Sequence, residues 1–418
     1  MPSIDPAADS LPRTPDRVIV RALWPVLLAA VISLFPFTIY STFLVPLAET
    51  SGQEVSVAGV LRGLGGIAAV LVGVAAAPLV ARLSARHTTA AGLVLLAVSG
   101  LVATIGTLPA LVLFCLGTGA VTAVLTPTLL RIAVATYPRR GDSGRAATIV
   151  TATQSLAAVL AAPLIGAVGL WRGWQGALWV TAGAAVLIAA LALRSSAAAA
   201  ATTSAMPALG YVESFRRLSR RRDLLAVIAI AFLRTTSFMG YLALLAAHYH
   251  QQFDLDPIAF TLVWTLSGAS FFAGNFLAGR WARGRGVRHR RLLWVGLVGA
   301  AIAVAAVFTT DLLVVALVAT AVMGFSHAVV AAILTTLIAG SAGELTAPTY
   351  SISAAGMSLG VFTGAVAAGL GLHWGGGPGM ALALSLPTLF AAALVPAAAR
   401  PPQIGTRDRR AGSPTRGG

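Results

Sequence analysis

Twelve apolar segments of roughly 20 residues each constrain this sequence more than any other feature. An apolar helix of that length can cross the hydrocarbon core of a bilayer, and lipid favours helices because the backbone must satisfy its own hydrogen bonds. Only 10% of the residues are charged, whereas a water-soluble domain carries about 25%. The sequence therefore predicts an all-α membrane protein with twelve crossings, at about 22–48, 55–81, 88–107, 110–137, 145–169, 175–193, 224–249, 257–280, 292–309, 312–339, 347–372 and 380–398.

Arginine is distributed unevenly between the two sides of the predicted membrane. All 29 basic residues are arginine, and 25 of them lie in the two tails and in the loops that alternate crossings place on one side. The other side has Arg172 together with five acidic residues. Because positively charged loops remain in the cytoplasm, we expect both termini to be cytoplasmic. The same distribution accounts for the net charge of +16 without a nucleic-acid partner.

The chain is expected to divide into two halves of six crossings. The predicted parts are a cytoplasmic tail (1–21), a first six-helix bundle (22–193), a cytoplasmic linker (194–223), a second six-helix bundle (224–398) and a second cytoplasmic tail (399–418). A stripe of small residues in the fifth crossing recurs in the eleventh, as Ala158, Ala162, Gly166 and Gly356, Gly360, Gly364. Such stripes let helix backbones approach closely in lipid. Two repeats around a polar cavity are typical of alternating-access transporters.

Several short motifs, in consistent order over about residues 22–398, resemble the major facilitator superfamily. The segment 77–86 resembles the family's signature loop between helices 2 and 3, with Arg82 and Arg86 at basic positions but Ala81 in place of the family's Asp. The segment 138–145, which ends at Arg145, resembles the entry to helix 5, and 171–174 resembles the turn before helix 6. The segment 162–167 contains Pro163 and Gly166 and resembles a weakened form of the motif of proton-coupled drug antiporters.

This resemblance implies the fold of that family, with twelve transmembrane helices in two pseudo-symmetric six-helix bundles. It also implies a monomeric secondary transporter in a bacterial cytoplasmic membrane, one that exports a small organic molecule in exchange for protons and is not an enzyme. An alternative is a carrier of organic or inorganic anions, similar to cyanate permeases. Intramembrane arginines such as Arg234, with no acid inside any crossing, favour that alternative.

Candidate substrate-binding residues are the polar and aromatic side chains inside the crossings. Arg234 lies near the middle of the seventh crossing, and Phe238 and Tyr241 follow on the same helical face. A buried arginine is costly unless it reaches water or a partner, so it either lines the cavity or bonds to a backbone carbonyl. Further candidates, each of which can instead pack or bond within the protein, are Gln154, Asn275, Tyr40 and Tyr350.

Candidate residues for proton coupling and gating are also few. His327, in the tenth crossing, titrates near neutral pH and is expected either to carry a proton or simply to be hydrogen-bonded. Glu49 and Glu54 flank the outer ends of the first two crossings, and either can pair with Arg62 to form an outer gate or carry the proton. Arg131 is expected to snorkel or to act as a latch at the cytoplasmic end of the fourth crossing.

Other chemistries find no support in the sequence. A phosphate-binding G-x-x-x-x-G-K-[ST] loop is missing, which argues against a motor driven by ATP. Neither a metal-ligating cluster nor a catalytic triad can be assembled from six scattered histidines, and the one cysteine, Cys115, cannot form an intramolecular disulfide. The sequence therefore predicts no cofactor and no metal, and its expected partners are lipid, a small-molecule substrate and H⁺.

Overall fold

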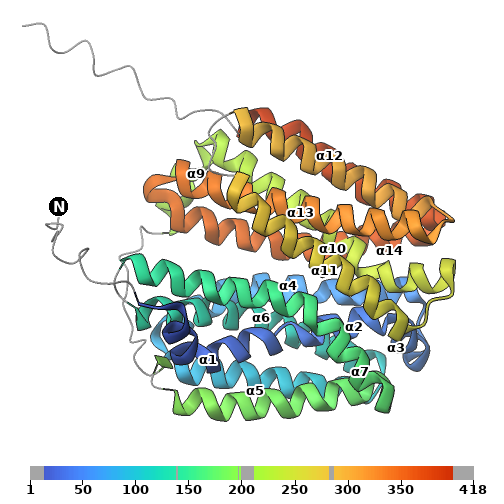
Figure 1. Ribbon diagram of the computed structural model, residues 1–418, viewed down its shortest axis with the longest axis horizontal. Helices are drawn as coiled ribbons and strands as arrows, with labels where there is room; N and C mark the ends of the chain where they lie inside the picture. Colours follow the sequence, from blue (N-terminus) through green and yellow to red (C-terminus); the bar gives the residue numbers. More distant parts are fainter. Residues whose placement is uncertain (1–13, 138–139, 196, 199–210, 282–286, 399–418) are drawn as a thin grey trace, which may run out of the picture.

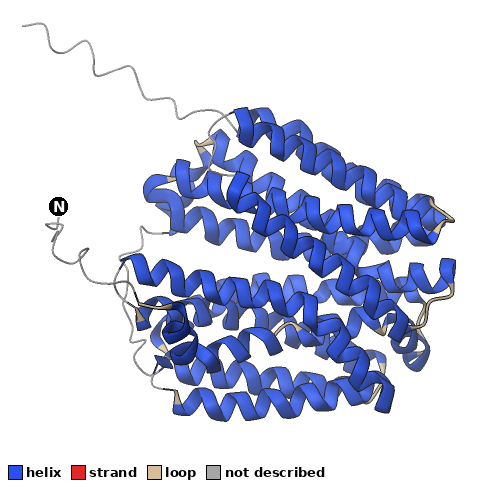
Figure 2. Ribbon diagram, viewed as in Figure 1, coloured by secondary structure: helices blue, strands red, loops and turns tan. Residues whose placement is uncertain are grey.

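The computed structural model describes residues 14–137, 140–195, 197–198, 211–281 and 287–398. Within these ranges the chain is almost entirely helical and contains no strand (Figure 2). Ten of its continuous helical segments are long and apolar enough to cross a membrane. The expectation of an all-α membrane protein is therefore confirmed.

The N-terminal bundle consists of the helices up to residue 194. Its members are α1 (Asp16–Ile32), α2 (Phe35–Thr42), α3 (Leu44–Ser51), α4 (Val55–Arg82), α5 (Ala85–Ala103), α6 (Leu108–Thr136) and α7 (Arg140–Arg194). The first crossing is broken near Ser33 and again at Phe43, which separates α1, α2 and α3. Pro36 and Pro46 follow the two breaks by a few residues, and proline cannot donate the backbone hydrogen bond that a continuous helix needs.

The C-terminal bundle begins after a short helix at the end of the linker, α9 (Tyr211–Ser219). It consists of α10 (Arg222–Phe253), α11 (Pro257–Trp281), α12 (Val287–Thr309), α13 (Leu313–Ser341), a single 3₁₀ turn (Gly343–Leu345) and α14 (Thr346–Ala398). In Figure 1 the two bundles lie one above the other, and the start of α1 and the end of α14 are at the same end of the molecule.

Two of the helices are each long enough for two crossings. α7 has 55 residues and α14 has 53, so a straight helix of either length would measure about 80 Å, against about 30 Å of hydrocarbon. Each helix is interrupted near its middle, α7 at Arg172 and Gly173 and α14 at Gly376. Both glycines have a positive φ with a ψ near −140° to −150°, a conformation essentially restricted to glycine. Counting both arms of each, the described part of the chain provides twelve crossings.

Among the described residues, the hydrophobic cluster that joins the two bundles lies at one end of the molecule. The end that carries Arg82, Arg145 and Arg280 is called here the arginine-rich end. At the opposite end, a single hydrophobic cluster takes members from both bundles, including Leu47 and Phe308. Toward the arginine-rich end there are instead two separate clusters, one made of residues up to 198 and the other of residues from 218 onward. The apolar seal between the bundles therefore lies at the opposite end.

Close backbone contacts connect the two bundles along the interface between them, which is called here the seam. A Cβ added to Gly66 of α4 would overlap the carbonyl oxygen of Ser358 on α14, and one added to Gly268 of α11 would lie 2.8 Å from the carbonyl oxygen of Ala158 on α7. The fifth-crossing stripe acts at the same seam, because a Cβ on Gly166 would lie 2.8 Å from Cγ2 of Thr261. Pro163 lies within α7 without ending it.

Candidate functional site

Arg62 is a buried cation on the seam between the bundles. Its helix, α4, runs along α14, and the residue retains only 3% of its exposure to solvent. Nη1 donates a hydrogen bond of 3.1 Å to the carbonyl oxygen of Met239 on α10. The guanidinium carbon also lies 3.5 Å from the ring centroid of Phe37 on α2, in the geometry of a cation–π contact. Arg62 is therefore held by both bundles.

A cavity of about 230 Å³ lies beside Arg62 and is called here the seam cavity. Its walls come from the α1–α2 region, α4 and α6 of the N-terminal bundle and from α10 and α14 of the C-terminal bundle. Tyr40 and Phe114 form an aromatic wall, with ring centroids 5.9 Å apart. The phenol of Tyr40 donates to the carbonyl oxygen of Ala58. The lining residues are Ser33, Leu34, Phe37, Tyr40, Arg62, Gly65, Gly66, Ala69, Phe114, Cys115, Thr118, Gly119, Thr122, Met239, Ser358 and Val361.

The proposed ion pair of Arg62 with Glu49 or Glu54 is absent from the described structure. Glu49 and Glu54 are both exposed, and a carboxylate oxygen of Glu54 accepts a hydrogen bond from Ser56. Arg62 uses the Met239 carbonyl instead. Met239 on the facing helix lies at the depth of Arg62, whereas Glu49 and Glu54 lie at the ends of crossings, so the carbonyl oxygen is the acceptor within reach.

A second buried cation, Arg234, lies inside the C-terminal bundle. Its Nη1 is 2.6 Å from Nε2 of His327 on α13, and its Nη2 is 3.4 Å from the sulfur of Met357 on α14. The imidazole of His327 stacks on Phe238, with centroids 3.8 Å apart and an interplanar angle of 14°. A guanidinium has donors only, so Nε2 of His327 accepts and the ring is neutral here. The structure thus brings together three of the candidate residues.

Tyr241 belongs to a hydroxyl cluster, away from the seam cavity lining. Its phenol donates to the hydroxyl of Thr320 at 3.2 Å, and the phenol of Tyr249 is 2.9 Å from the same oxygen. Both tyrosines are fully buried. The cluster ties α10 to α13 within the C-terminal bundle.

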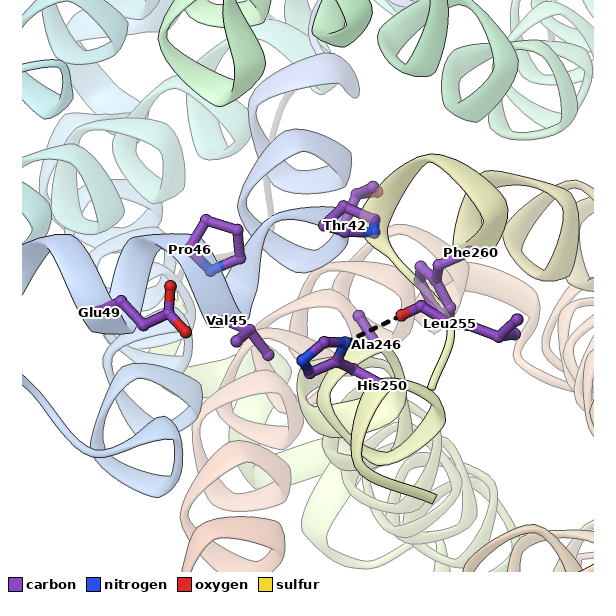
Figure 3. Close-up of a pocket in the computed structure, with 9 residues that line it drawn as sticks. Thr42, Val45, Pro46, Glu49, Ala246, His250, Leu255 and Phe260 are labelled. Atoms are coloured by element: carbon purple, nitrogen blue, oxygen red, sulfur yellow. Dashed lines mark hydrogen bonds between the residues drawn. The ribbon is translucent and has the colours of Figure 1, made fainter. Parts of the chain in front are cut away.

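A smaller pocket of about 110 Å³ lies between the bundles, near the opposite end, and Figure 3 shows the side chains that line it. Glu49 of α3 and His250 of α10 line it, with Val45 between them in this view. His250 bonds through Nδ1 to the carbonyl oxygen of Leu255. An acid and a histidine from different bundles therefore border one pocket on the sealed side of the molecule.

The remaining polar candidates do not line the seam cavity. Gln154 and Asn275 are each half-buried, on α7 and α11. Tyr350 is 36% exposed and donates to the carbonyl oxygen of Thr335. It therefore connects α14 to α13, and its phenol is used within the C-terminal bundle.

The arginines expected at gates have structural partners at the arginine-rich end. Arg131 donates to the carbonyl oxygens of Val80 and Leu83 at 3.0 and 3.2 Å, and so binds the C-terminal end of α4 and the residue after it. Arg145 pairs with Asp16 and, at 3.2 Å, with Asp142. The side chain of Ala81 lies outside the described residues. Arg82 is exposed and Arg86 is half-buried.

The stripe on α14 packs against α10. A Cβ on Gly360 would lie 3.0 Å from the carbonyl oxygen of Phe232, and one on Gly364 would overlap the carbonyl oxygen of Thr236. Gly356 is less crowded, with Phe232 3.8 Å away. Close helix packing, expected from the spacing, is therefore observed, and the partner helix is α10.

Sequence reasoning missed several residues around Arg62. Phe37, Phe114 and Met239 are apolar and resemble their neighbours in the crossings, so composition gives no signal for them. Met239 contributes its backbone carbonyl, which no side-chain pattern can reveal. Phe37, in the short helix after the first break, could have been found from Pro36, which follows that break.

Comparison with known proteins identifies the architecture. A family model described as Major Facilitator Superfamily matches residues 26–349. A crystal structure of a bacterial homologue of the human lysosomal transporter Spinster, inward-facing and unoccupied, is 14% identical and has a TM-score of 0.68, with 92% of this chain and 96% of that chain covered. The human organic anion transporter MFSD10 (TETRAN) is 17% identical with a TM-score of 0.62, covering 92% and 100%. Among curated proteins none matches.

Proposed function

The chain belongs to the major facilitator superfamily, and we propose that it moves a small organic molecule across a bacterial cytoplasmic membrane by alternating access. The observation that carries this proposal is the seam cavity, whose walls come from both bundles. Rocking of the bundles would change the accessibility of such a cavity from one side to the other. We propose the protein works as a monomer, because each chain holds both walls.

The packing of the bundles at the two ends indicates which side of the membrane is closed in this conformation. The bundles share one hydrophobic cluster at the opposite end and have separate clusters at the arginine-rich end. Positively charged loops favour a cytoplasmic location for the arginine-rich end. Under that orientation the conformation is closed to the outside.

Proton coupling is the second part of the proposal. His327 is the histidine that contacts a buried cation, and it is neutral in this conformation. A proton on His327 would place two positive charges in contact, so its uptake must coincide with movement of Arg234 or arrival of an anion. The proposed direction of transport, export, is supported by the segment 162–167, which resembles the motif of proton-coupled drug antiporters. Gly166 of this segment packs on Thr261.

Reconstituted protein tests the proposal. Proteoliposomes are assayed for flux of labelled organic anions, neutral aromatic compounds and lipophilic cations, with and without a pH gradient. We expect saturable flux of at least one compound, absent from protein-free liposomes. If the protein exchanges its substrate for protons, uptake of the labelled compound should be faster when the lumen is acidified. If substrate and proton move together, uptake should be faster when the external medium is acidified. Folded protein that moves no compound under any gradient would contradict transport.

A further inference from the structure

The Arg62 guanidinium has one occupied edge and one free edge. Nη1 donates a hydrogen bond to the carbonyl oxygen of Met239, and the ring of Phe37 covers one face of the guanidinium plane. Nε and Nη2 are buried, and neither has a hydrogen-bond partner. These two nitrogens lie on the same edge of the planar group. Leaving buried charged donors unsatisfied costs free energy, so this edge calls for a ligand.

The charge on Arg62 is also unbalanced. Among the described residues no ion pair reaches Arg62, and the described lining of the seam cavity contains no aspartate or glutamate. An arginine that is 3% exposed cannot rely on bulk water for screening. A negatively charged ligand would supply both the missing charge and the missing acceptors.

The geometry of the free edge selects the kind of anion. Nε–H and Nη2–H point in parallel, as a fork that matches the two oxygens of a carboxylate. Met239 and Phe37 hold the guanidinium beside the seam cavity. Because Nε and Nη2 are closed to solvent in this conformation, the side chains around this edge must move slightly when a ligand binds. A lysine at the same place would offer a point charge without the fork.

The rest of the cavity selects the body that carries the carboxylate. Tyr40 and Phe114 supply an aromatic wall, and Ala69, two turns along α4 from Arg62, is a further apolar member. The volume of about 230 Å³ is below the range of about 300–1,000 Å³ typical for drug-sized ligands. The body must therefore be compact and apolar.

Resting on the proposed transport function, we propose that the seam cavity binds a small organic monocarboxylate. Its carboxylate is held bidentately by Nε and Nη2 of Arg62, and its apolar or aromatic body lies against Tyr40 and Phe114. The site thereby commits the protein to anionic substrates and excludes lipophilic cations.

Titration calorimetry on the purified protein in nanodiscs tests this proposal with benzoate as the probe. Benzamide is the neutral analogue, benzylamine the cationic analogue and sulfate the anion without an apolar body. We expect saturable binding of benzoate, with affinity at least about tenfold above that for each of the other three. Equal binding of benzamide, stronger binding of sulfate, or no binding of benzoate would overturn the proposal.

Variants locate the binding. Arg62→Gln is expected to abolish benzoate binding, and Arg62→Lys, which keeps the charge but not the fork, to weaken it by about tenfold or more. Arg172→Gln, at an exposed arginine, is the matched control and should bind as the native protein does. Ala69→Phe fills the cavity without altering Arg62 and should also lose binding. Native-like benzoate binding by Arg62→Gln would refute the site.

Flux measurements on the same preparations separate this proposal from the transport function. If proteoliposomes move a neutral or cationic compound but benzoate does not bind, the carboxylate site is wrong and transport stands. If benzoate binds through Arg62 but neither benzoate nor any other compound is moved, the site is correct and the transport function is wrong.

Discussion

Arg234 on α10 donates a hydrogen bond to His327 on α13, with 2.6 Å between Nη1 and Nε2. Two ionisable side chains thus share one buried contact, with the imidazole stacked on Phe238. The contact holds the histidine in the acceptor state, and it stabilises the guanidinium without a carboxylate. Any change of protonation at His327 must act on Arg234 first.

Removing the acceptor should destabilise the C-terminal bundle. His327→Leu leaves Nη1 of Arg234 buried without an oxygen or nitrogen acceptor, and we expect a loss of about 1–3 kcal/mol in the free energy of unfolding. His327→Gln keeps an acceptor and should lose less. Thermal unfolding in detergent measures both, with His87→Gln, at an exposed histidine, as the control. Equal stability of the Leu and Gln variants would show that the contact contributes nothing.

The contact between α10 and α14 should tolerate no side chain at Gly364. Gly364→Ala forces a Cβ into the carbonyl oxygen of Thr236, so the helices must separate, at a cost of about 1–3 kcal/mol or more. Gly340→Ala is the matched control, because nothing lies within 4 Å of a Cβ there. Fluorescence-detected gel filtration after heating should show a lower midpoint for Gly364→Ala alone. A midpoint equal to that of the control would contradict the packing described here.

Arg131 should act as a cap for α4 and not as a substrate ligand. Its guanidinium donates to the carbonyl oxygens of Val80, in the last turn of that helix, and Leu83, just after it. Arg131→Gln is expected to lower stability by about 1 kcal/mol and to leave benzoate affinity unchanged, as measured by unfolding and by calorimetry. Arg82→Gln, on an exposed side chain, is the comparison. A selective loss of benzoate binding in Arg131→Gln would assign it to the site instead.

Cys115 offers a probe of which end is open. It is the one cysteine of the chain, and it lines the seam cavity while being 3% exposed. A membrane-impermeant thiosulfonate should modify it in inside-out vesicles and much more slowly in right-side-out vesicles, because the bundles are sealed at the end opposite the arginine-rich one. Mass spectrometry of intact protein measures the reaction, and Cys115→Ala is the blank. Faster modification from outside would reverse the assigned orientation.

The fold was predictable because lipid leaves a strong signal in sequence. Long apolar segments with few polar interruptions identify the crossings, and glycine spacing identified the face that α14 buries. The partner of that glycine face was not predictable, because it depends on the arrangement of helices far apart in the chain.

The candidate site was predictable only in part. Arg62, Arg234 and His327 are conspicuous as ionisable residues inside apolar segments, and burial of all three follows from that position. Their partners do not follow. Arg62 bonds to a backbone carbonyl of the other bundle, and every residue has such a carbonyl, so sequence cannot select Met239. The pairing of Arg234 with His327 depends on how α10 and α13 are rotated about their axes.

The absence of a side chain at Gly66, opposite the Ser358 carbonyl, limits how the protein can change shape. Two helix backbones already in touch cannot come nearer, and they lose their contact if pulled apart. Under the proposed rocking of the two bundles, this contact would act as the pivot, about which one end of the molecule widens as the other narrows. Because it borders the seam cavity, a bound ligand would sit beside the pivot and travel little while access to it reverses.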